Sequence, residues 1–125
     1  MEYTLSMVCE VEYTDEFETW WYTLSEEAQE DVSAIVSLLE EKGISLRYPY
    51  STAITQSRHS HLRELRVQSQ GLPLRILYAF DPRRVAILLI GGCKKGDDRW
   101  YEVFIPLADK LYDDHLKLLK KENLL

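Results

Sequence analysis

Three apolar stretches follow one another closely in the middle of the chain, and they constrain the fold more than any other feature. Residues 62–69 and 74–80 are apolar stretches interrupted by a few polar side chains, and residues 70–73, with Gly71 and Pro73, join them. Residues 81–84 then lead into a third stretch, residues 85–91. Links this short, made of turn-forming residues, can join only antiparallel neighbours. The sequence therefore predicts three consecutive antiparallel strands.

The N-terminal half predicts a strand followed by two helices. Residues 7–13 alternate like a half-buried strand, and Thr14 or Asp15 can cap a short helix through residue 22. Ser25 opens a second helix that Gly43 ends. Its apolar residues recur at helical spacing: Ala28, Val32, Ile35, Val36 and Leu39. We expect these helices to form a hairpin whose apolar faces pack on a sheet.

The rest of the chain completes the predicted order β-α-α-β-β-β-α. Residues 44–61 have no regular period and are expected to form a long loop, and residues 91–98 a glycine-rich charged loop. Pro106 is expected in the first turn of a last helix, which would bury Leu107, Leu111, Leu116 and Leu119. The predicted class is α+β: a small antiparallel sheet with a mixed edge, packed by the N-terminal αα-hairpin, in a single domain over residues 1–125.

Composition narrows the setting in which the protein works. No apolar run approaches the ~20 residues needed to cross a bilayer, and the N-terminus has no signal-peptide pattern. We therefore expect a cytoplasmic protein with no membrane partner. Cys9 and Cys93 are the two cysteines. Free thiols are favoured in a reducing cytoplasm, and one disulfide remains the alternative.

Charge is distributed unevenly along the chain, whose net charge is −6. Residues 1–57 hold 12 acidic and 2 basic residues, whereas residues 58–100 hold 4 acidic and 9 basic ones. A basic segment inside an acidic chain indicates a local anion site, although solvated strand faces would give the same count.

Alternation along the predicted strands separates the arginines of this segment. Arg66 falls on the face opposite Leu65, which should point to the helices, so Arg66 is expected on an open face and Arg63 on the other. Arg75 can lie beside Arg66 across the hairpin. Two arginines on one face can hold a phosphate between their guanidinium groups, each by two hydrogen bonds. Alternatively, they can be there to form a salt bridge with Glu64. Nearby basic and aromatic residues suit single-stranded RNA: Lys94, Lys95, Arg99 and Tyr101.

Other chemistry has little support in the sequence. The glycine-rich loop lacks the spacing of a phosphate-binding P-loop. His59, His61 and His115 do not have the spacing of metal ligands, so no metal and no small-molecule cofactor is expected. No nucleophile motif is recognisable.

The predicted order and several short motifs resemble the toxins of the RelE/ParE superfamily, in particular its HigB-like branch of phage-derived Gp49-like proteins. The resemblance covers nearly the whole chain. The motifs are Leu-Arg-Glu-Leu-Arg-Val-Gln at residues 62–68, Ile-Leu-Tyr-Ala-Phe-Asp-Pro at 76–82 and Gly-Gly-Cys-Lys-Lys at 91–95. The resemblance implies a toxin of a type II toxin–antitoxin system. Most toxins of this branch are ribosome-dependent mRNA endonucleases, so the resemblance also implies that activity. It also implies a helix-turn-helix antitoxin as partner, with mRNA and the ribosome as targets.

The same resemblance implies roles for particular residues. Attack of the RNA 2′-hydroxyl on the adjacent phosphate would need no metal, and cationic side chains would stabilise the added charge. The implied catalytic residues are Arg66, Arg75, Lys94, Lys95 and Tyr101, and those assigned to RNA binding are Arg58, His61, Arg63 and Arg99.

Two departures leave an alternative open. Glu64 stands where some relatives carry a lysine, and the sequence pI of about 5.1 is low for a ribosome-cutting enzyme. A non-catalytic toxin that binds a protein such as gyrase, or a phage accessory protein, is the alternative. The aromatic run Trp20-Trp21-Tyr22 is interpreted as core, with an antitoxin interface as the second reading.

Overall fold

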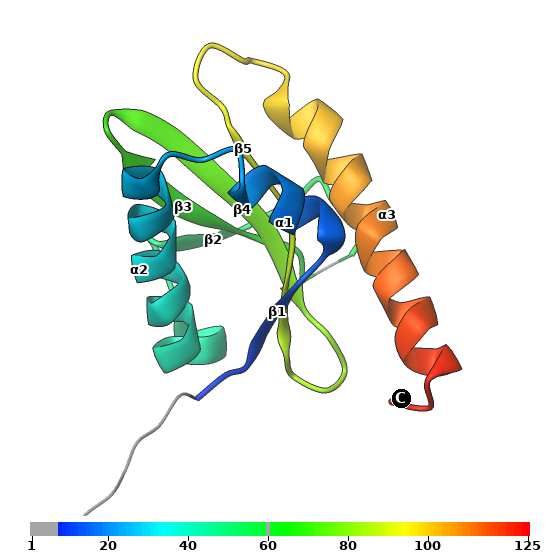
Figure 1. Ribbon diagram of the computed structural model, residues 1–125. Coiled ribbons are helices and arrows are strands. Elements are labelled where there is room, and N and C mark those ends of the chain that lie inside the picture. The colour runs from blue at the N-terminus through cyan, green and yellow to red at the C-terminus, as the bar shows by residue number, and fades with distance from the viewer. Residues whose placement is uncertain (1–7, 60) are drawn as a thin grey trace, which may run out of the picture.

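The computed structural model describes residues 8–59 and 61–125, and over these residues it has a five-stranded sheet with helices on both faces (Figure 1). The strand order is β1-β5-β4-β3-β2. The edge strand β1 runs parallel to β5, and the other pairs are antiparallel. The strands are β1 (Val11–Tyr13), β2 (Ser51–Ala53), β3 (Arg63–Ser69), β4 (Leu72–Phe80) and β5 (Ala86–Cys93). The predicted α+β class and the mixed edge are confirmed; the part of the first predicted strand at residue 7 lies outside the described residues.

Both predicted N-terminal helices are present and capped as expected. Helix α1 (Asp15–Trp21) begins after Thr14, whose side chain accepts a hydrogen bond from the backbone N–H of Phe17. Helix α2 (Glu26–Lys42) begins after Ser25, which accepts one from Ala28 in the same way, and ends at Gly43 with φ of 57°. Such caps satisfy backbone donors that the first helical turn leaves free. The apolar faces of these helices bury one side of the sheet, through Phe17, Val32 and Leu39 against Leu65, Val67, Ile76 and Tyr78.

The three central strands form the predicted meander, but the β3–β4 turn is tighter than expected. Only Gln70 and Gly71 lie outside the strands, with φ of 54° and 78°. Two consecutive left-handed residues match the twist of a hairpin, and glycine accepts that conformation without strain. Pro73, expected in the turn, therefore pairs with Gln68 inside the ladder.

The prediction of an unbroken loop over residues 44–61 is wrong. A short 3₁₀ turn, η1 (Gly43–Ser45), continues from α2, and β2 pairs with β3 as the other edge of the sheet. Three residues are too few to show a strand period, and β2 depends on its partners. Ser51 shares a hydrogen bond of 2.7 Å with the hydroxyl of Tyr78, and Thr52 donates to Glu64.

The last helix, α3 (Trp100–Lys121), begins six residues before Pro106 and not at it. Trp100 is 1% exposed, and its indole lies against Gly92, where a Cβ would come within 2.7 Å of Nε1. This packing fixes the start of the helix. Pro106 leaves the Glu102 carbonyl without its helical donor, which is tolerable because Glu102 is exposed and water can reach it.

The start of α3 also corrects the expectation of an open sheet face. α3 packs on the face opposite α1 and α2, as Figure 1 shows. It buries Trp100, Ile105, Ala108, Leu111 and Tyr112 against Leu62, Leu77, Ala79, Ile87 and Leu89. Tyr101 accordingly lies in the first turn of α3 and not in a loop.

Candidate functional site

Arg66 and Arg75 are directly paired across the β3–β4 hairpin. Alternation puts both on the α3 face of the sheet, opposite Leu65. The Arg66 side chain is 31% exposed, whereas Arg75 is 4% exposed. The predicted proximity is confirmed, but the face is open only at Arg66. Two guanidinium groups this close repel each other unless an anion lies beside them.

Glu64 is that anion. It is 5% exposed, and its carboxylate lies 3.6 Å from Arg66 Nη1 and 3.7 Å from Arg75 Nε. These distances are ion-pair contacts longer than hydrogen bonds. The hydrogen bonds to the carboxylate come from Thr52 Oγ1 and the Tyr101 hydroxyl, each at 2.7 Å. The salt-bridge interpretation of Glu64 therefore describes the resting site. We call Glu64, Arg66, Arg75 and Tyr101 the arginine cluster.

Tyr101 is held in its protonated form by this environment. Burial and the hydrogen bond to Glu64 raise its pKa above the ordinary value of 10.0, against the opposite influence of Arg75. At neutral pH the phenol is thus a donor and not a base. Lys94 Nζ lies 5.4 Å from the centroid of the Tyr101 ring, which adds a third cation to the cluster.

Two buried N–H groups beside the cluster lack a hydrogen-bond partner among the described residues. They are Arg75 Nε and Trp100 Nε1. Arg75 pairs with Gly92, on which Trp100 packs, so both donors belong to one region of the α3 face. A buried unsatisfied donor costs about 1–3 kcal/mol. Together with the Arg66 guanidinium, these two groups make the region rich in N–H donors.

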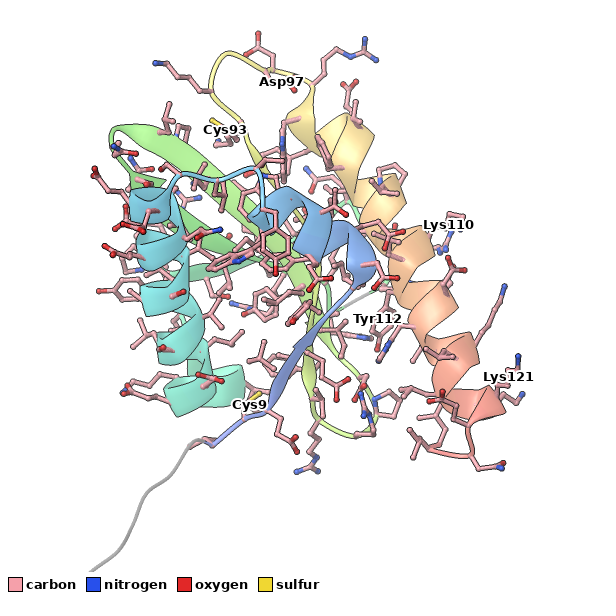
Figure 2. All side chains as sticks on the ribbon, in the orientation of Figure 1. Cys9, Cys93, Asp97, Lys110, Tyr112 and Lys121 are labelled. Atoms are coloured by element: carbon pink, nitrogen blue, oxygen red, sulfur yellow. The ribbon has the colours of Figure 1, made fainter. Side chains whose placement is uncertain are left out.

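The remaining basic residues after β5 lie in the exposed loop that precedes α3. Lys95 is exposed and forms no ion pair with the described residues, and Arg99 pairs with Glu102 at 3.0 Å. Figure 2 shows this end of the molecule, where Cys93 and Asp97 are labelled. Of the basic residues in this segment, Lys94 thus contacts the arginine cluster, whereas Lys95 and Arg99 are exposed in the loop before α3.

Three residues assigned to RNA binding lie elsewhere. Arg58 forms an ion pair with Asp113, and His61 Nε2 lies 3.0 Å from the Tyr112 hydroxyl. Both contact the middle of α3, where Figure 2 labels Tyr112. Arg63 faces the other side of the sheet, as alternation predicts, and donates from Nε to Ser51 Oγ at 3.0 Å. The structure does not bring these three residues to the arginine cluster.

Sequence reasoning missed three contributors to the cluster. Thr52 lies in the unpredicted strand β2. The Tyr48 ring centroid is 5.7 Å from Arg66 Cζ, in the segment expected to be a loop. Trp100 was missed because the last helix was predicted to begin near Pro106, after this residue. Its one sequence signal is Gly92, a strand glycine of the kind that marks close approach of another group.

The described residues offer no metal centre: no three His, Cys, Asp or Glu side chains converge among them. None of the helices in the described part of the chain is both long and apolar enough to span a bilayer.

These observations define a class of protein, a small α+β fold of RelE-like arrangement in which a mixed sheet carries paired arginines on its α3 face. A family model described as phage derived protein Gp49-like matches residues 19–113. The chain belongs to this Gp49-like family, which confirms the resemblance seen in the sequence.

Two proteins of Mycobacterium tuberculosis are similar to the chain. One, named "Putative toxin HigB3", is 40% identical over 100 residues, which cover 79% of this chain and 86% of that protein. The other, named "Putative toxin HigB2", is 42% identical over 99 residues, covering 78% of this chain. The chain spans 49% of the length of this second relative.

Proposed function

We propose that the chain is the toxin of a type II toxin–antitoxin pair and a metal-independent endoribonuclease that cuts mRNA on the ribosome, in the cytoplasm. Its antitoxin would be a helix-turn-helix protein. The family and the names of the two relatives support the toxin assignment. The observation that carries the nuclease assignment is the arginine cluster, in which a carboxylate, a phenol and two guanidinium groups meet.

In this proposal Arg66 binds the phosphate at the cleavage point. It is the half-exposed member of the pair, and its guanidinium fork matches two phosphate oxygens. Arg75 is buried and holds the Glu64 carboxylate in place. Lys94 adds charge beside Tyr101. Fixed cations in a partly buried site stabilise the negative charge that develops on the phosphorane, the largest single contribution available here.

The proton transfers follow from the states of Glu64 and Tyr101. The Glu64 carboxylate takes the proton of the RNA 2′-hydroxyl as O2′ bonds to phosphorus. The bond from phosphorus to O5′ breaks, and Tyr101, whose pKa is raised, gives its proton to O5′. The products are a 2′,3′-cyclic phosphate and a 5′-hydroxyl. Tyr101 then recovers a proton from Glu64 through their 2.7 Å hydrogen bond.

The other basic residues take secondary places in this proposal. Lys95 and Arg99 are exposed in the loop that carries Lys94 toward Tyr101, so they suit the RNA backbone on one side of the cut. Arg58 and His61 would contact RNA only where it extends along α3. Arg63 supports β2 through Ser51.

Expression of the chain without its antitoxin tests the proposal. We expect growth arrest and new RNA 5′ ends within coding regions shortly after induction. Arg66→Ala should relieve the arrest, and Tyr101→Phe should lower cleavage by about 10²–10⁴-fold, the usual size of a proton-transfer contribution. Lys120→Ala, which removes an exposed cation elsewhere on α3, is the control and should remain toxic. A folded Arg66→Ala variant that still cuts RNA would refute the phosphate role.

Two observations favour the alternative, a toxin that binds a protein target such as gyrase. Glu64 already neutralises part of the arginine pair, and the net charge of −6 disfavours docking on RNA. This reading predicts arrest with intact mRNA and a Tyr101→Phe variant as toxic as the parent chain. RNA mapped after induction separates the two functions.

A further inference from the structure

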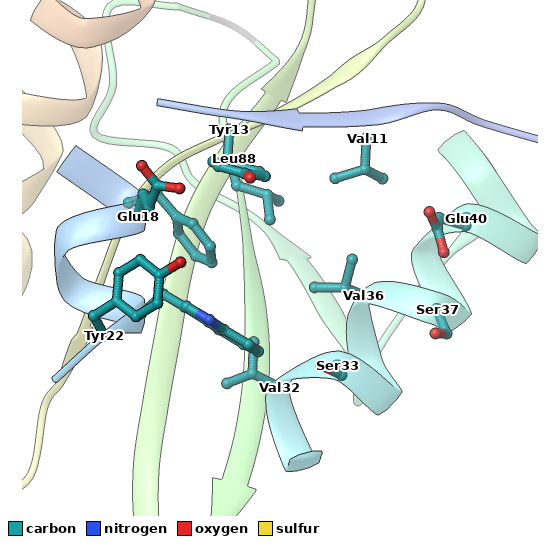
Figure 3. Close-up of a pocket in the computed structure, with 12 residues that line it drawn as sticks. Val11, Tyr13, Glu18, Tyr22, Val32, Ser33, Val36, Ser37, Glu40 and Leu88 are labelled. Atoms are coloured by element: carbon teal, nitrogen blue, oxygen red, sulfur yellow. The ribbon is translucent and has the colours of Figure 1, made fainter. Parts of the chain in front are cut away.

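A groove lies between α1 and α2, on the face of the sheet opposite the arginine cluster. Its volume is about 420 Å³. The floor is apolar, with Val11 and Leu88 from strands β1 and β5, Phe17 from α1, and Val32 and Val36 from α2. Figure 3 shows Val11 and Val36 pointing toward each other across it. A cleft of this size, within the range of ~300–1,000 Å³ typical of binding sites, can receive several apolar side chains.

Large aromatic side chains border the groove without being buried. Tyr22 is 72% exposed and Tyr13 is 57% exposed, and Trp21 lines the groove from α1. The three aromatic residues of the run therefore differ in their contacts. Trp20 packs on Gly91, Trp21 packs against the core and also lines the groove, and Tyr22 lines the groove from an exposed position. Exposed tyrosine and tryptophan around an apolar floor are typical of protein interfaces.

The rim of the groove is acidic. Glu18 on α1 and Glu40 on α2 stand on opposite sides of it (Figure 3). A second depression, which shares Trp21 with the groove, adds Glu26 and Glu30. None of the described residues that line either depression is Lys or Arg. This matches the excess of acids in residues 1–57, and it disfavours RNA as the occupant while favouring a basic partner.

We infer that this groove is the docking site of the antitoxin, through an amphipathic segment whose apolar side chains fill the groove and whose Lys or Arg side chains meet the acidic rim. The inference rests on the toxin assignment of the proposed function. An amphipathic helix lying in an apolar groove is a recurrent mode of peptide recognition, and charge complementarity sets its register and its rate of association.

The test measures binding between the purified chain and the purified helix-turn-helix antitoxin that the proposed function assigns to it, by titration calorimetry. Tyr22→Ala removes an exposed aromatic anchor and should weaken binding about tenfold or more. The double variant Glu18→Lys with Glu40→Lys should weaken it by a similar factor at low salt. The loss should shrink at about 0.5 M salt, where the Debye length is a few ångströms.

A matched double variant controls for net charge. Asp114→Lys with Glu122→Lys makes the same change of charge on exposed positions of the α3 side and should leave the affinity within about twofold. The inference is overturned if the groove variants bind the antitoxin as tightly as the parent chain. It is also overturned if the control variant loses as much affinity as the groove variants do. Self-association of the chain that the groove variants abolish, with antitoxin binding intact, also overturns it, because the occupant is then a second copy.

The outcome is independent of catalysis because no RNA enters the assay. A chain that cuts no RNA can still bind its antitoxin through the groove. Conversely, if the chain cuts RNA and its antitoxin binds the groove variants as tightly as the parent chain, the docking site is refuted while the proposed function is retained.

Discussion

Replacing Glu64 by Gln tests how much the arginine cluster depends on a buried charge. The substitution keeps the size of the side chain, and its amide can accept from one of Thr52 and Tyr101 while donating to the hydroxyl oxygen of the other. It removes the charge facing two guanidinium groups. Arg75, at 4% exposure, would be left as a buried and uncompensated cation. Truncating one partner of a buried pair costs about 3–5 kcal/mol. Because Gln retains a dipole, we expect the unpaired Arg75 to lower the free energy of unfolding by about 2–3 kcal/mol.

The half-exposed pair with Arg66 adds at most about 1 kcal/mol. We therefore expect the free energy of unfolding to fall by about 3 kcal/mol, measured by urea denaturation followed through tryptophan fluorescence. Glu122→Gln, at an exposed position, is the control and should stay within about 0.5 kcal/mol of the parent chain.

Added inorganic phosphate should restore part of the lost stability, because an anion that binds only the folded state stabilises it by mass action. Phosphate should stabilise the Glu64→Gln variant more than the parent chain, in which Glu64 already forms ion pairs with both arginines. A Glu64→Gln variant as stable as the parent would refute the reasoning, since the charge would then contribute nothing. Equal phosphate effects on both proteins would show that the arginine pair is not an anion site.

Two further predictions concern the neighbouring residues. Gly92→Ala should lower stability by about 1–3 kcal/mol in the same urea assay, because the new Cβ would lie 2.7 Å from buried Trp100; a neutral result would mean that α3 shifts freely. The raised pKa of Tyr101 means that the folded state favours the neutral phenol, so its contribution to stability is complete below the unfolded pKa near 10 and is lost as pH rises through the folded value. Tyr101→Phe should therefore flatten the alkaline fall of the melting temperature, and an unchanged pH profile would contradict the raised pKa.

Local signals in the sequence predicted much of the fold. The caps at Thr14 and Ser25, the glycine at the end of α2 and the short links of the meander act between residues close in sequence. Such features are independent of the rest of the chain, which explains why they were recognised correctly. Alternation also separated Arg63 from Arg66, because side chains in a strand alternate faces whatever packs on them.

Features that depend on distant partners were missed or placed wrongly. β2 exists because β3 offers it a ladder, and the start of α3 depends on Trp100 settling on Gly92. Pro106 gave a misleading signal because a proline inside a helix is tolerated where water can reach the carbonyl that it leaves free. The prediction of an open sheet face was wrong because no local sequence pattern shows which face α3 covers.

From the amino-acid sequence alone, the order of all α-helices and strands except β2 was predicted, together with the family resemblance and the two arginines that share one face. The state of the site depends on tertiary packing. That packing placed Glu64 between Arg66 and Arg75, buried Arg75 and raised the pKa of Tyr101. It also opened the acidic groove between α1 and α2. Burial and electrostatic energies depend on through-space distances between strands and helices that are far apart in the chain, and spacing along the sequence does not encode those distances.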